Sequence, residues 1–350
     1  MKFTTSLFSQ ILQVVPRVSF LRLVYECGAE RHAKGFSSWD QYVAMLFCQL
    51  AQAKSLREIS DGLAVTCGKL SHLGLRAAPA RSTLSYANAH RPWQLYQNAF
   101  FHLRDFCRSE NTGKKKKFRF KNKLLSLDST TIDLCLSLFP WADFRQTKGA
   151  IKLHLLLDHD GYLPDFALIT DGKTTDVITA RHFTLPAGSI VAVDRAYCDF
   201  ELFFQWNNSG VFFVTRLKGN AAYEVIYNRS LPQRGNVLTD QVIRFTGPVT
   251  KQKYPGLLRR VVVWDEENQR EIELLTNHHG FGATTIGRIY RDRWEIELFF
   301  KVLKQHLKIK TVVGTSPNAL KTQIWTALIA VLLLKYLRSV PKAICLSAAW

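Results

Sequence analysis

Residues 124–128 read LLSLD and residues 189–194 read SIVAVD, and these two stretches decide the fold of a chain of 350 residues. Each is a short run of apolar and β-branched residues, the pattern of a strand buried on both faces of a sheet. Each ends in an aspartate, Asp128 in the first and Asp194 in the second. Because an unpaired buried carboxylate is costly, an acid at the end of a buried strand indicates a site at the edge of the sheet.

Further elements surround these two stretches. The patterns predict strands over residues 150–158, 164–170 and 211–218, and helices over residues 176–183 and 198–206. The order β-β-β-α-β-α-β resembles a ribonuclease H-like core, an α/β fold with a mixed sheet that carries carboxylates at the ends of its first and fourth strands. We therefore expect Asp128 to close the first strand and Asp194 to close the fourth.

Changes in composition divide the chain into segments. The pattern is helical up to Ser109, turns basic, and becomes strand-like from Leu124, with short strands and turn residues again after Lys218. The expected domains are a helical N-terminal DNA-binding domain at 1–110, a basic linker at 111–123, a ribonuclease H-like catalytic core at 124–217 and 285–340, a β-rich insertion at 218–284 and a short tail at 341–350.

The helical N-terminal region carries two signals for helix starts. Ser38 with Gln41, and Ser55 with Glu58, have capping-box spacing ahead of apolar-periodic segments. Three short helical patterns follow Ser55, a spacing compatible with a helix-turn-helix-like unit. Such triplets are also common structural filler, so DNA binding by this unit and a purely structural role are both open.

The charge of the chain favours a polyanionic partner. Lys and Arg number 47 against 28 Asp and Glu, a formal net charge of +19. Nucleic acid is the expected partner at this charge, and a membrane surface is a weaker one. The lysine run in TGKKKKFRFKNK, residues 112–123, fits either a solvated linker or a strand edge that contacts phosphates, with Phe118 and Phe120 alternating with basic residues.

Cysteine usage and hydropathy bear on the compartment. The seven cysteines are scattered, odd in number and without a CxxC motif, so we expect reduced thiols in the cytosol rather than disulfides or a zinc site. The N-terminus lacks the pattern of a signal peptide, and the longest apolar run, residues 324–334, is too short to span a bilayer and is expected to be a buried helix. No GxxxxGK[ST] motif indicates use of ATP.

A polar stripe marks the helical pattern IYRDRWEIELFFKVLKQHLK at residues 289–308. At 100° per residue, Tyr290, Arg293, Glu297 and Lys304 fall within about 60° of one another on a single helix, with apolar residues opposite. A carboxylate between two cations and a phenol suits a metal ion that faces a phosphate, provided that more carboxylates join it.

Asp128, Asp194 and Glu297 supply the acids that phosphodiester chemistry needs. Such a cluster can hold two divalent metals about 3.5–4 Å apart, one beside the attacking water or 3′-hydroxyl and one beside the leaving oxygen. Ligands that are all oxygen favour Mg²⁺, with Mn²⁺ as a substitute, over zinc. The three acids are therefore the candidate catalytic and metal-binding residues.

Other polar and aromatic residues have weaker patterns. Trp294 borders the stripe, either as a partly buried helix anchor or as a stacking surface for an unpaired base. Lys301 and Lys308 extend its basic edge as backbone contacts at most. The remaining candidates are histidines expected at surface or strand positions and acids expected in turns, helix caps or support of the metal ligands, namely His154, His159, His182, His278, His279 and His306, and Asp171, Asp176 and Asp199.

The chain resembles the DDE transposases of bacterial insertion sequences, in the group with a Tyr-(2)-Arg-(3)-Glu-(6)-Lys signature. Residues 290–304 have that spacing, the contexts LSLDSTTIDLC and VAVDRAYCDF resemble the two aspartate motifs, and the helical N-terminal region is similar to that of many members. The resemblance implies that Asp128, Asp194 and Glu297 are the metal-binding triad. It implies DNA contacts for Tyr290, Arg293 and Lys304, with Trp294 beside them.

The resemblance further implies cleavage at transposon ends, strand transfer into double-stranded target DNA, and at least a dimer that synapses two ends. Two alternatives stay open, a nuclease on the same core and an inactive transposase-derived DNA-binding protein. Members commonly continue through a further helical region, whereas this chain stops at VPKAICLSAAW, so we expect a truncated tail that weakens dimerisation.

Overall fold

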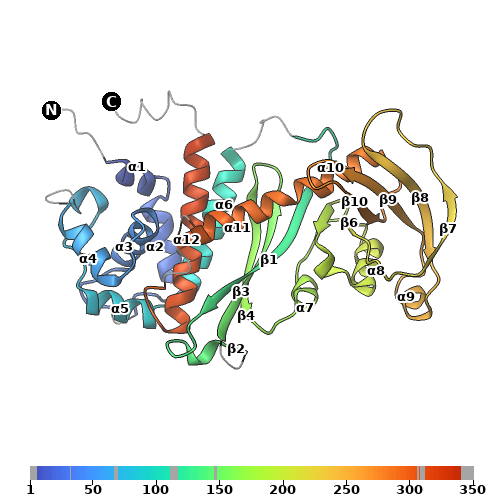
Figure 1. Ribbon diagram of the computed structural model, residues 1–350. Coiled ribbons are helices and arrows are strands. Elements are labelled where there is room, and N and C mark those ends of the chain that lie inside the picture. Colours follow the sequence, from blue (N-terminus) through green and yellow to red (C-terminus); the bar gives the residue numbers. More distant parts are fainter. Residues whose placement is uncertain are drawn as a thin grey trace. The chain divides into compact units, whose positions relative to one another are not determined.

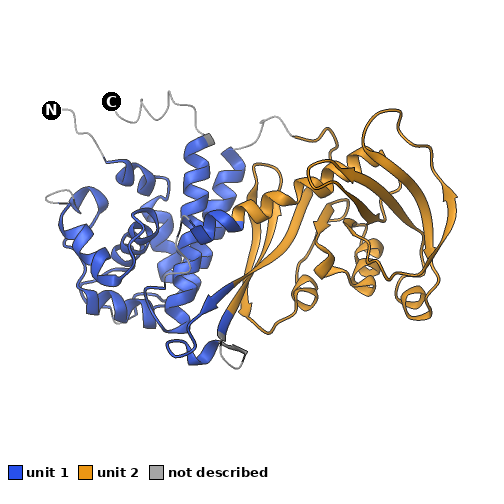
Figure 2. Ribbon diagram, in the orientation of Figure 1, with its two compact units in different colours: residues 1–114, 132–150, 300–350 blue, residues 115–131, 151–299 orange. Residues whose placement is uncertain are grey.

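The computed structural model in Figure 1 describes residues 6–31, 33–66, 70–110, 117–145, 148–305, 307 and 312–339. The chain forms two compact units, coloured in Figure 2: residues 1–114, 132–150 and 300–350 make unit 1, and residues 115–131 and 151–299 make unit 2. The boundaries of these two units differ from the domain boundaries expected from composition. Several predictions fall outside the described residues, namely those on residues 111–116, 341–350, Cys67, Cys345, His306 and Lys308.

Unit 1 is a helical bundle. Its N-terminal helices are α1 (Leu7–Gln13), α2 (Arg17–Glu26), α3 (Ser38–Leu50), α4 (Leu56–Ala64), α5 (Arg81–His90) and α6 (Gln94–Glu110), with the 3₁₀ turn η1 (Leu70–Leu73). The predicted cap at Ser55 is confirmed, because its side chain accepts from the Glu58 N–H. The other predicted cap is wrong by one residue: Ser37, with Asp40, forms the capping box of α3.

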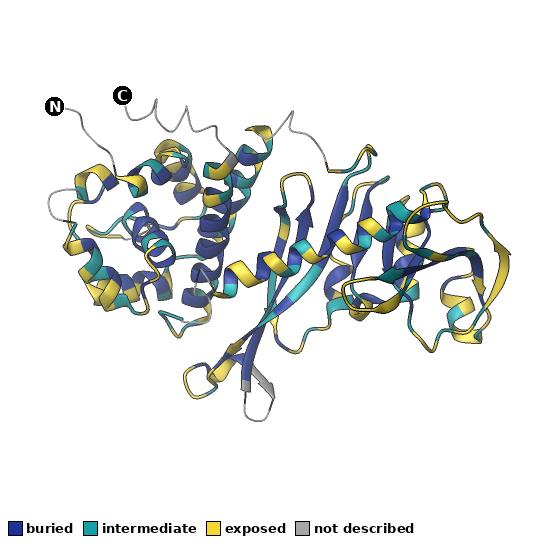
Figure 3. Cartoon of the chain, turned by 45° about the horizontal axis from the view of Figure 1, so that its top comes forward, coloured by how far each residue is buried: buried dark blue, intermediate teal, exposed yellow. Residues whose placement is uncertain are grey.

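The C-terminal helix α12 (Pro317–Ser339) packs against α3, α5 and α6 of the same unit. Trp325 is buried against the rings of Phe100 and Phe101. The predicted apolar run is thus a buried helix, as expected, and Figure 3 shows α12 buried along most of its length. The length argument against a membrane span was wrong, because the 22 residues Pro317–Arg338 are long and apolar enough to cross a bilayer. However, 72% of the most apolar part of this helix is buried inside the protein, as in the core helix of a folded domain.

Unit 2 is built on a mixed sheet. Its strands are β1 (Leu124–Leu134), β3 (Lys148–Asp158), β4 (Leu163–Asp171), β5 (Ile190–Val193) and β6 (Phe212–Arg216), followed by β7 (Tyr223–Asn228), β8 (Val237–Phe245), β9 (Leu258–Asp265) and β10 (Arg270–Thr276). The order is β4-β3-β1-β5-β6-β10-β9-β8-β7, and the short β2 (Asp143–Arg145) pairs with β3 as part of unit 1.

Strand directions confirm the ribonuclease H-like core. β1, β5 and β6 run parallel to one another, and β3 runs antiparallel to β4. The His159 N–H donates to the Leu124 carbonyl, which places the end of β3 beside the start of β1, so these two strands also run in opposite directions. The expected β-β-β-α-β-α-β order is therefore present, with the β7–β10 strands continuing the same sheet antiparallel to β6.

Helices cover both faces of the central strands, because alternate residues of β1 and β5 point to opposite sides. Leu125, Leu127, Val191 and Val193 pack with α8 (Phe200–Asn208), in a cluster that also contains Phe203 and Trp206. Leu124, Ile190 and Ala192 pack with α10 (Ala283–Asp292) through Ile286 and Ile289. A run such as IVAV, apolar at every position, is what such a two-sided burial requires.

The described part of the basic linker, residues 117–123, contains no strand, so the predicted strand edge is wrong there. Phe118 and Phe120 stack on each other, and Phe120 stacks on Phe281. Both rings pack against the apolar cluster on the α10 side of the sheet. Burial of the two rings thus explains the alternation that suggested a strand.

Candidate active site

The two strand aspartates lie on neighbouring parallel strands. Leu127 of β1 pairs with Val193 of β5, and the next step of the same register places Asp128 beside Asp194. Both continue the alternation of Leu124 and Ile190, and the Asp194 backbone is extended, so both side chains belong to the face covered by α10. Asp194 follows β5 as predicted, whereas Asp128 does not close β1, which continues to Leu134.

The polar stripe lies across a helix junction rather than on a single helix. α10 ends at Asp292, Arg293 is a turn residue, and α11 (Trp294–Gln305) begins directly after it. The backbone tightens at the junction, since the Arg293 N–H donates to the Tyr290 carbonyl and the Ile296 N–H donates to the Arg293 carbonyl, each three residues apart. The prediction of one uninterrupted helix was wrong at this residue.

Arg293 joins the strand acid to the helix acid. One guanidinium nitrogen lies 3.4 Å from Asp128 Oδ2, and the other donates to Glu297 Oε1 at 2.7 Å. The guanidinium carbon lies 5.5 Å from the centre of the Tyr290 ring. Arg293 is buried, with 8% exposure, so this cation compensates two carboxylates with little help from water.

The electrostatics of the site are dominated by burial and by the close approach of acids. Burial raises the pKa of Asp128 to about 6, with Glu297 and Asp194 adding to the rise while the Ser129 N–H and Arg293 oppose it. Burial also raises the pKa of Tyr290. Although burial works against the charge of Arg293, Tyr290 and the two acids raise its pKa overall. The site thus holds negative charge that lacks full compensation, as a cation site requires.

This charge predicts that Asp128→Asn stabilises the metal-free protein at high pH. The raised pKa means that the stability contributed by Asp128 is full below its ordinary pKa and is lost as the pH rises through about 6. We expect the variant to be more stable than wild type by about 1–3 kcal/mol at pH 8 and equal to it near pH 4. Urea unfolding in EDTA at both pH values measures this. Asp133→Asn, at an exposed position of β1, is the control; equal pH dependence of Asp128→Asn and wild type would contradict the account.

The three candidate acids have the right chemistry to bind a divalent cation, but their side chains are not positioned to hold one in this structure. Carboxylate oxygens are the ligands that Mg²⁺ and Mn²⁺ prefer. Among the residues that the structure describes, however, no three His, Cys, Asp or Glu side chains are grouped closely enough to hold a metal ion. The Arg293 guanidinium pairs with two of the three acids instead. A bound cation would therefore take over carboxylate oxygens that Arg293 now contacts.

A groove of about 1100 Å³ opens beside these residues in unit 2. Asp194, Tyr290, Arg293 and Glu297 line it, and so does Trp294. Trp294 is 57% exposed, so the interpretation of this residue as a partly buried anchor is wrong. Lys304 lies on α11 two turns after Glu297, at a position that belongs to unit 1, and Lys301 is exposed on the same helix.

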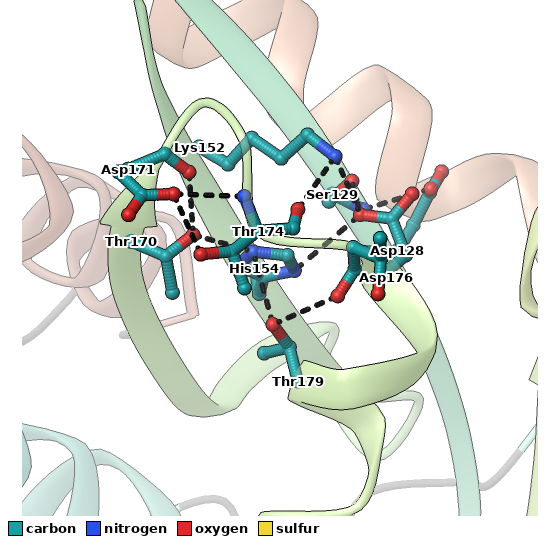
Figure 4. A network of polar contacts seen from close by, with 10 residues as sticks. Asp128, Ser129, Lys152, His154, Thr170, Asp171, Thr174, Asp176 and Thr179 are labelled. Carbon is teal, nitrogen blue, oxygen red and sulfur yellow. Dashed lines mark hydrogen bonds and ion pairs between the residues drawn. The ribbon is translucent and has the colours of Figure 1, made fainter. Parts of the chain in front are cut away.

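A polar network, drawn in Figure 4, supports Asp128 from the next residue along β1. The Ser129 hydroxyl donates to Asp176 at 2.7 Å, and Lys152 lies 3.3 Å from the same carboxylate oxygen. His154 Nδ1 is 3.7 Å from that oxygen, and burial lowers the pKa of His154 to about 4, which leaves the ring neutral at pH 7. Asp176 was predicted only as one of three supporting acids, and no spacing in the sequence singled out Ser129.

The remaining predictions for single residues have mixed outcomes. Asp199 caps α8 through the Leu202 N–H, and Asp171 accepts from the Thr174 N–H in a turn, both as expected. His154 lies on β3, as predicted. His159 and His278 are buried outside strands, so the expectation of surface or strand positions was wrong for both. The described cysteines are free thiols, and three of them, Cys48, Cys107 and Cys198, are buried.

Fold and site together define an α/β protein with a ribonuclease H-like core, in which Asp128 and Asp194 lie on neighbouring parallel strands and Arg293 connects Asp128 to Glu297. The family model "Transposase DDE domain" matches residues 119–333, and "Domain of unknown function (DUF4372)" matches residues 4–76. The chain belongs to the DDE transposase domain family. Members of this family generally use divalent metal ions, and membership indicates DNA as the partner.

Individual relatives agree with the family. The chain is 30% identical to "Putative transposase y4zB" of Sinorhizobium fredii, over 74% of this chain and 71% of the relative. It is 31% identical to "Probable transposase for insertion sequence element IS5377" of Geobacillus stearothermophilus, over 65% of this chain and 60% of the relative. A solved piggyBac transposase synaptic complex with hairpin DNA has a TM-score of 0.46 and 12% identity, over 97% of this chain and 74% of that one, and this likeness says nothing further about the chain.

Proposed function

We propose that this chain cuts a phosphodiester bond at each end of its own element and joins the freed 3′-hydroxyl to target DNA. In the first step a water oxygen bonds to the scissile phosphorus and the 3′ oxygen leaves. In the second step that 3′-hydroxyl attacks a target phosphodiester, one phosphorus–oxygen bond forms and one breaks. The two steps use the same site, which therefore has to accept two different nucleophiles.

The observation that carries the proposal is the β1–β5 register, which places Asp128 beside Asp194 on the side covered by α10. Glu297 reaches the same place through the Arg293 bridge. Asp128, Asp194 and Glu297 would hold Mg²⁺, with Mn²⁺ as a substitute. When bound, the metal would supply a more acidic nucleophile and neutralise the charge that develops on phosphate.

The lining of the groove supports a path for DNA. Seven acids line it, among them Asp194 and Glu297, and six basic residues lie between them, namely Lys117, Arg216, Arg270, Arg288, Arg291 and Arg293. Arginine can pair with phosphate through two hydrogen bonds, which fixes the register of a strand. In this proposal Tyr290, Arg293 and Lys304 contact the end DNA, and exposed Trp294 offers a ring for stacking on an unpaired base.

Strand transfer with two ends requires at least two active sites, so the proposal includes a homodimer on paired ends. The nuclease alternative predicts cleavage without joining. The alternative of an inactive DNA-binding protein predicts neither, but the pairing of Asp128 and Glu297 with one buried arginine, Arg293, supports an active site.

The test is Mg²⁺-dependent cleavage and joining of a paired-end DNA substrate that carries the element's own terminal sequences. The proposal predicts nicked products and joined products, both abolished by EDTA. Cleavage without joining would favour the nuclease. Binding of end DNA without either product would favour the inactive DNA-binding protein. Asp240→Asn, which alters a buried acid of β8 paired with Arg259, is a matched control for general loss of stability.

A further inference from the structure

A second chain of hydrogen bonds lies buried beside the Asp128–Arg293–Glu297 bridge. Ser126 Oγ lies 2.7 Å from His159 Nε2, and His159 Nδ1 lies 2.6 Å from Asp292 Oδ2. The three residues come from β1, the turn after β3 and the end of α10, all in unit 2. Their exposures are 0%, 7% and 6%, so water competes little for these bonds.

The order serine, histidine, aspartate is also that of a hydrolase triad, but burial argues against a nucleophile. Ser126 has no exposed surface, so no substrate reaches its hydroxyl. The hydrogen bonds of the network can form whether the His159 imidazole is neutral or protonated. With Asp292 accepting from Nδ1–H, a neutral imidazole accepts from the Ser126 hydroxyl at Nε2, and an imidazolium donates to its oxygen. The arrangement is therefore a fixed connection between its two ends.

Asp292 is held from more than one direction. Lys117 forms an ion pair with its carboxylate, and the Tyr162 hydroxyl lies 3.2 Å from Oδ2. Although burial works the other way, the bonds from His159 and Lys117 lower the pKa of Asp292, so it is an anion at neutral pH. A buried anion with three partners has one favourable position, because losing any partner is costly.

The two ends of this hydrogen-bond network, Ser126 and Asp292, lie next to the proposed site residues in the sequence. Ser126 precedes Asp128 by two residues and lies on the same face of β1. Asp292 immediately precedes Arg293, the residue that contacts both Asp128 and Glu297. The same strand and the same helix junction are thus connected twice, once through Ser126, His159 and Asp292 and once through the Arg293 bridge.

We propose that Ser126, His159 and Asp292 are positioning residues that set the distance between the strand acids and the α10–α11 junction. This inference rests on the proposed function. Without the connection, Arg293 and Glu297 keep their chemistry but lose a fixed position relative to Asp128. Misplacement of this kind lowers the rate of the chemical step and leaves DNA affinity almost unchanged, since none of the three side chains offers a cation to phosphate.

The test compares wild type with Ser126→Ala, Asp292→Asn and the double variant. The measurements are kcat for Mg²⁺-dependent nicking, the Mg²⁺ concentration for half-maximal rate, Kd for end DNA, and Tm. We expect each single variant to lower kcat by about 10–100-fold with Kd within about twofold of wild type. The double variant should be no slower than the slower single variant, because both break one connection.

Asp240→Asn is the matched control, since Asp240 is also a buried acid, 4% exposed, with Arg259 as its partner. It should lower Tm and leave kcat of the folded fraction unchanged. Wild-type kcat in both single variants overturns this inference alone, and so do additive losses in the double variant. Absence of nicking by wild type overturns the proposed function and this inference with it. If Asp292→Asn does not fold, Ser126→Ala decides, because it removes one oxygen only.

Discussion

Glu297→Gln is expected to reduce Mg²⁺-dependent cleavage and joining by roughly 10³-fold while Kd for end DNA changes by less than about threefold. The substitution keeps the shape of the side chain and removes the charge that would bind a cation. Arg293 can still donate to the amide oxygen in place of Glu297 Oε1, so the helix junction keeps its fold. Rates on a paired-end substrate and a binding isotherm in EDTA measure the two quantities separately.

The control is Glu295→Gln, which makes the same chemical change two residues away in the lining of the same groove. Glu295 lies 4.0 Å from Lys117 and has no contact with Arg293 among the interactions of the described residues. We expect near wild-type rates from it. Equal rates for Glu297→Gln and Glu295→Gln would show that the helix acid does not bind the metal.

Arg293→Ala is expected to destabilise the metal-free protein by about 3 kcal/mol at pH 8, because it leaves Asp128 and Glu297 buried or half-buried without their shared cation. The structure also predicts that Mg²⁺ stabilises the variant more than it stabilises wild type. In wild type a divalent cation has to take over oxygens that the guanidinium contacts, whereas in the variant those oxygens are available. Urea unfolding with and without saturating Mg²⁺ measures both effects.

The same variant should nick end DNA about 10²-fold more slowly at saturating Mg²⁺, since a cation next to the phosphate is lost. Arg291→Ala is the control, because Arg291 is exposed in the same groove and forms no ion pair with an acid among the described residues. Equal stability of Arg293→Ala and wild type in EDTA would contradict the account of the bridge. So would an identical gain in stability from Mg²⁺ in the two proteins.

The sheet was predictable from the sequence because its signals are local. The SIVAVD stretch has apolar side chains at every position and an acid at its end, and β5 with Asp194 matches it. The end of β1 was not predicted from LLSLD, because three polar residues, Ser129 to Thr131, follow this stretch before the buried Ile132 and Leu134. Three polar residues in succession have no hydrophobic period, so they hide the continuation of the strand.

The helix junction depended on contacts between distant parts of the chain. No Gly or Pro interrupts residues 289–305, and Arg293 keeps αR dihedrals, so helical periodicity predicted a single helix. Asp292 is instead held by His159, more than a hundred residues earlier, and by Lys117 of the basic linker. Lys117 of the lysine run therefore has a specific ion-pair partner, Asp292. Composition alone could not distinguish this lysine from the others in the run.

The sequence predicted the three acids as a set, and this stays a prediction; their present partners could not be predicted. Asp128 and Glu297 are separated by more than 160 residues, and only the folded chain shows Arg293 between them. Spacing on a helix gave the shared side of Arg293 and Glu297 correctly. The spacing could not show that the Arg293 side chain lies between Asp128 and Glu297, where an open metal site was expected.

Mn²⁺ binding to the protein on end DNA tests the central claim most directly, because it reports the metal site without requiring turnover. The comparison is between wild type, Asp194→Asn and Asp199→Asn, measured by electron paramagnetic resonance; Asp199 caps α8 five residues after Asp194. We predict about two Mn²⁺ per protomer for wild type and for Asp199→Asn, and loss of at least one from Asp194→Asn. Wild-type stoichiometry and affinity in Asp194→Asn would contradict the assignment of Asp128, Asp194 and Glu297 as the metal ligands.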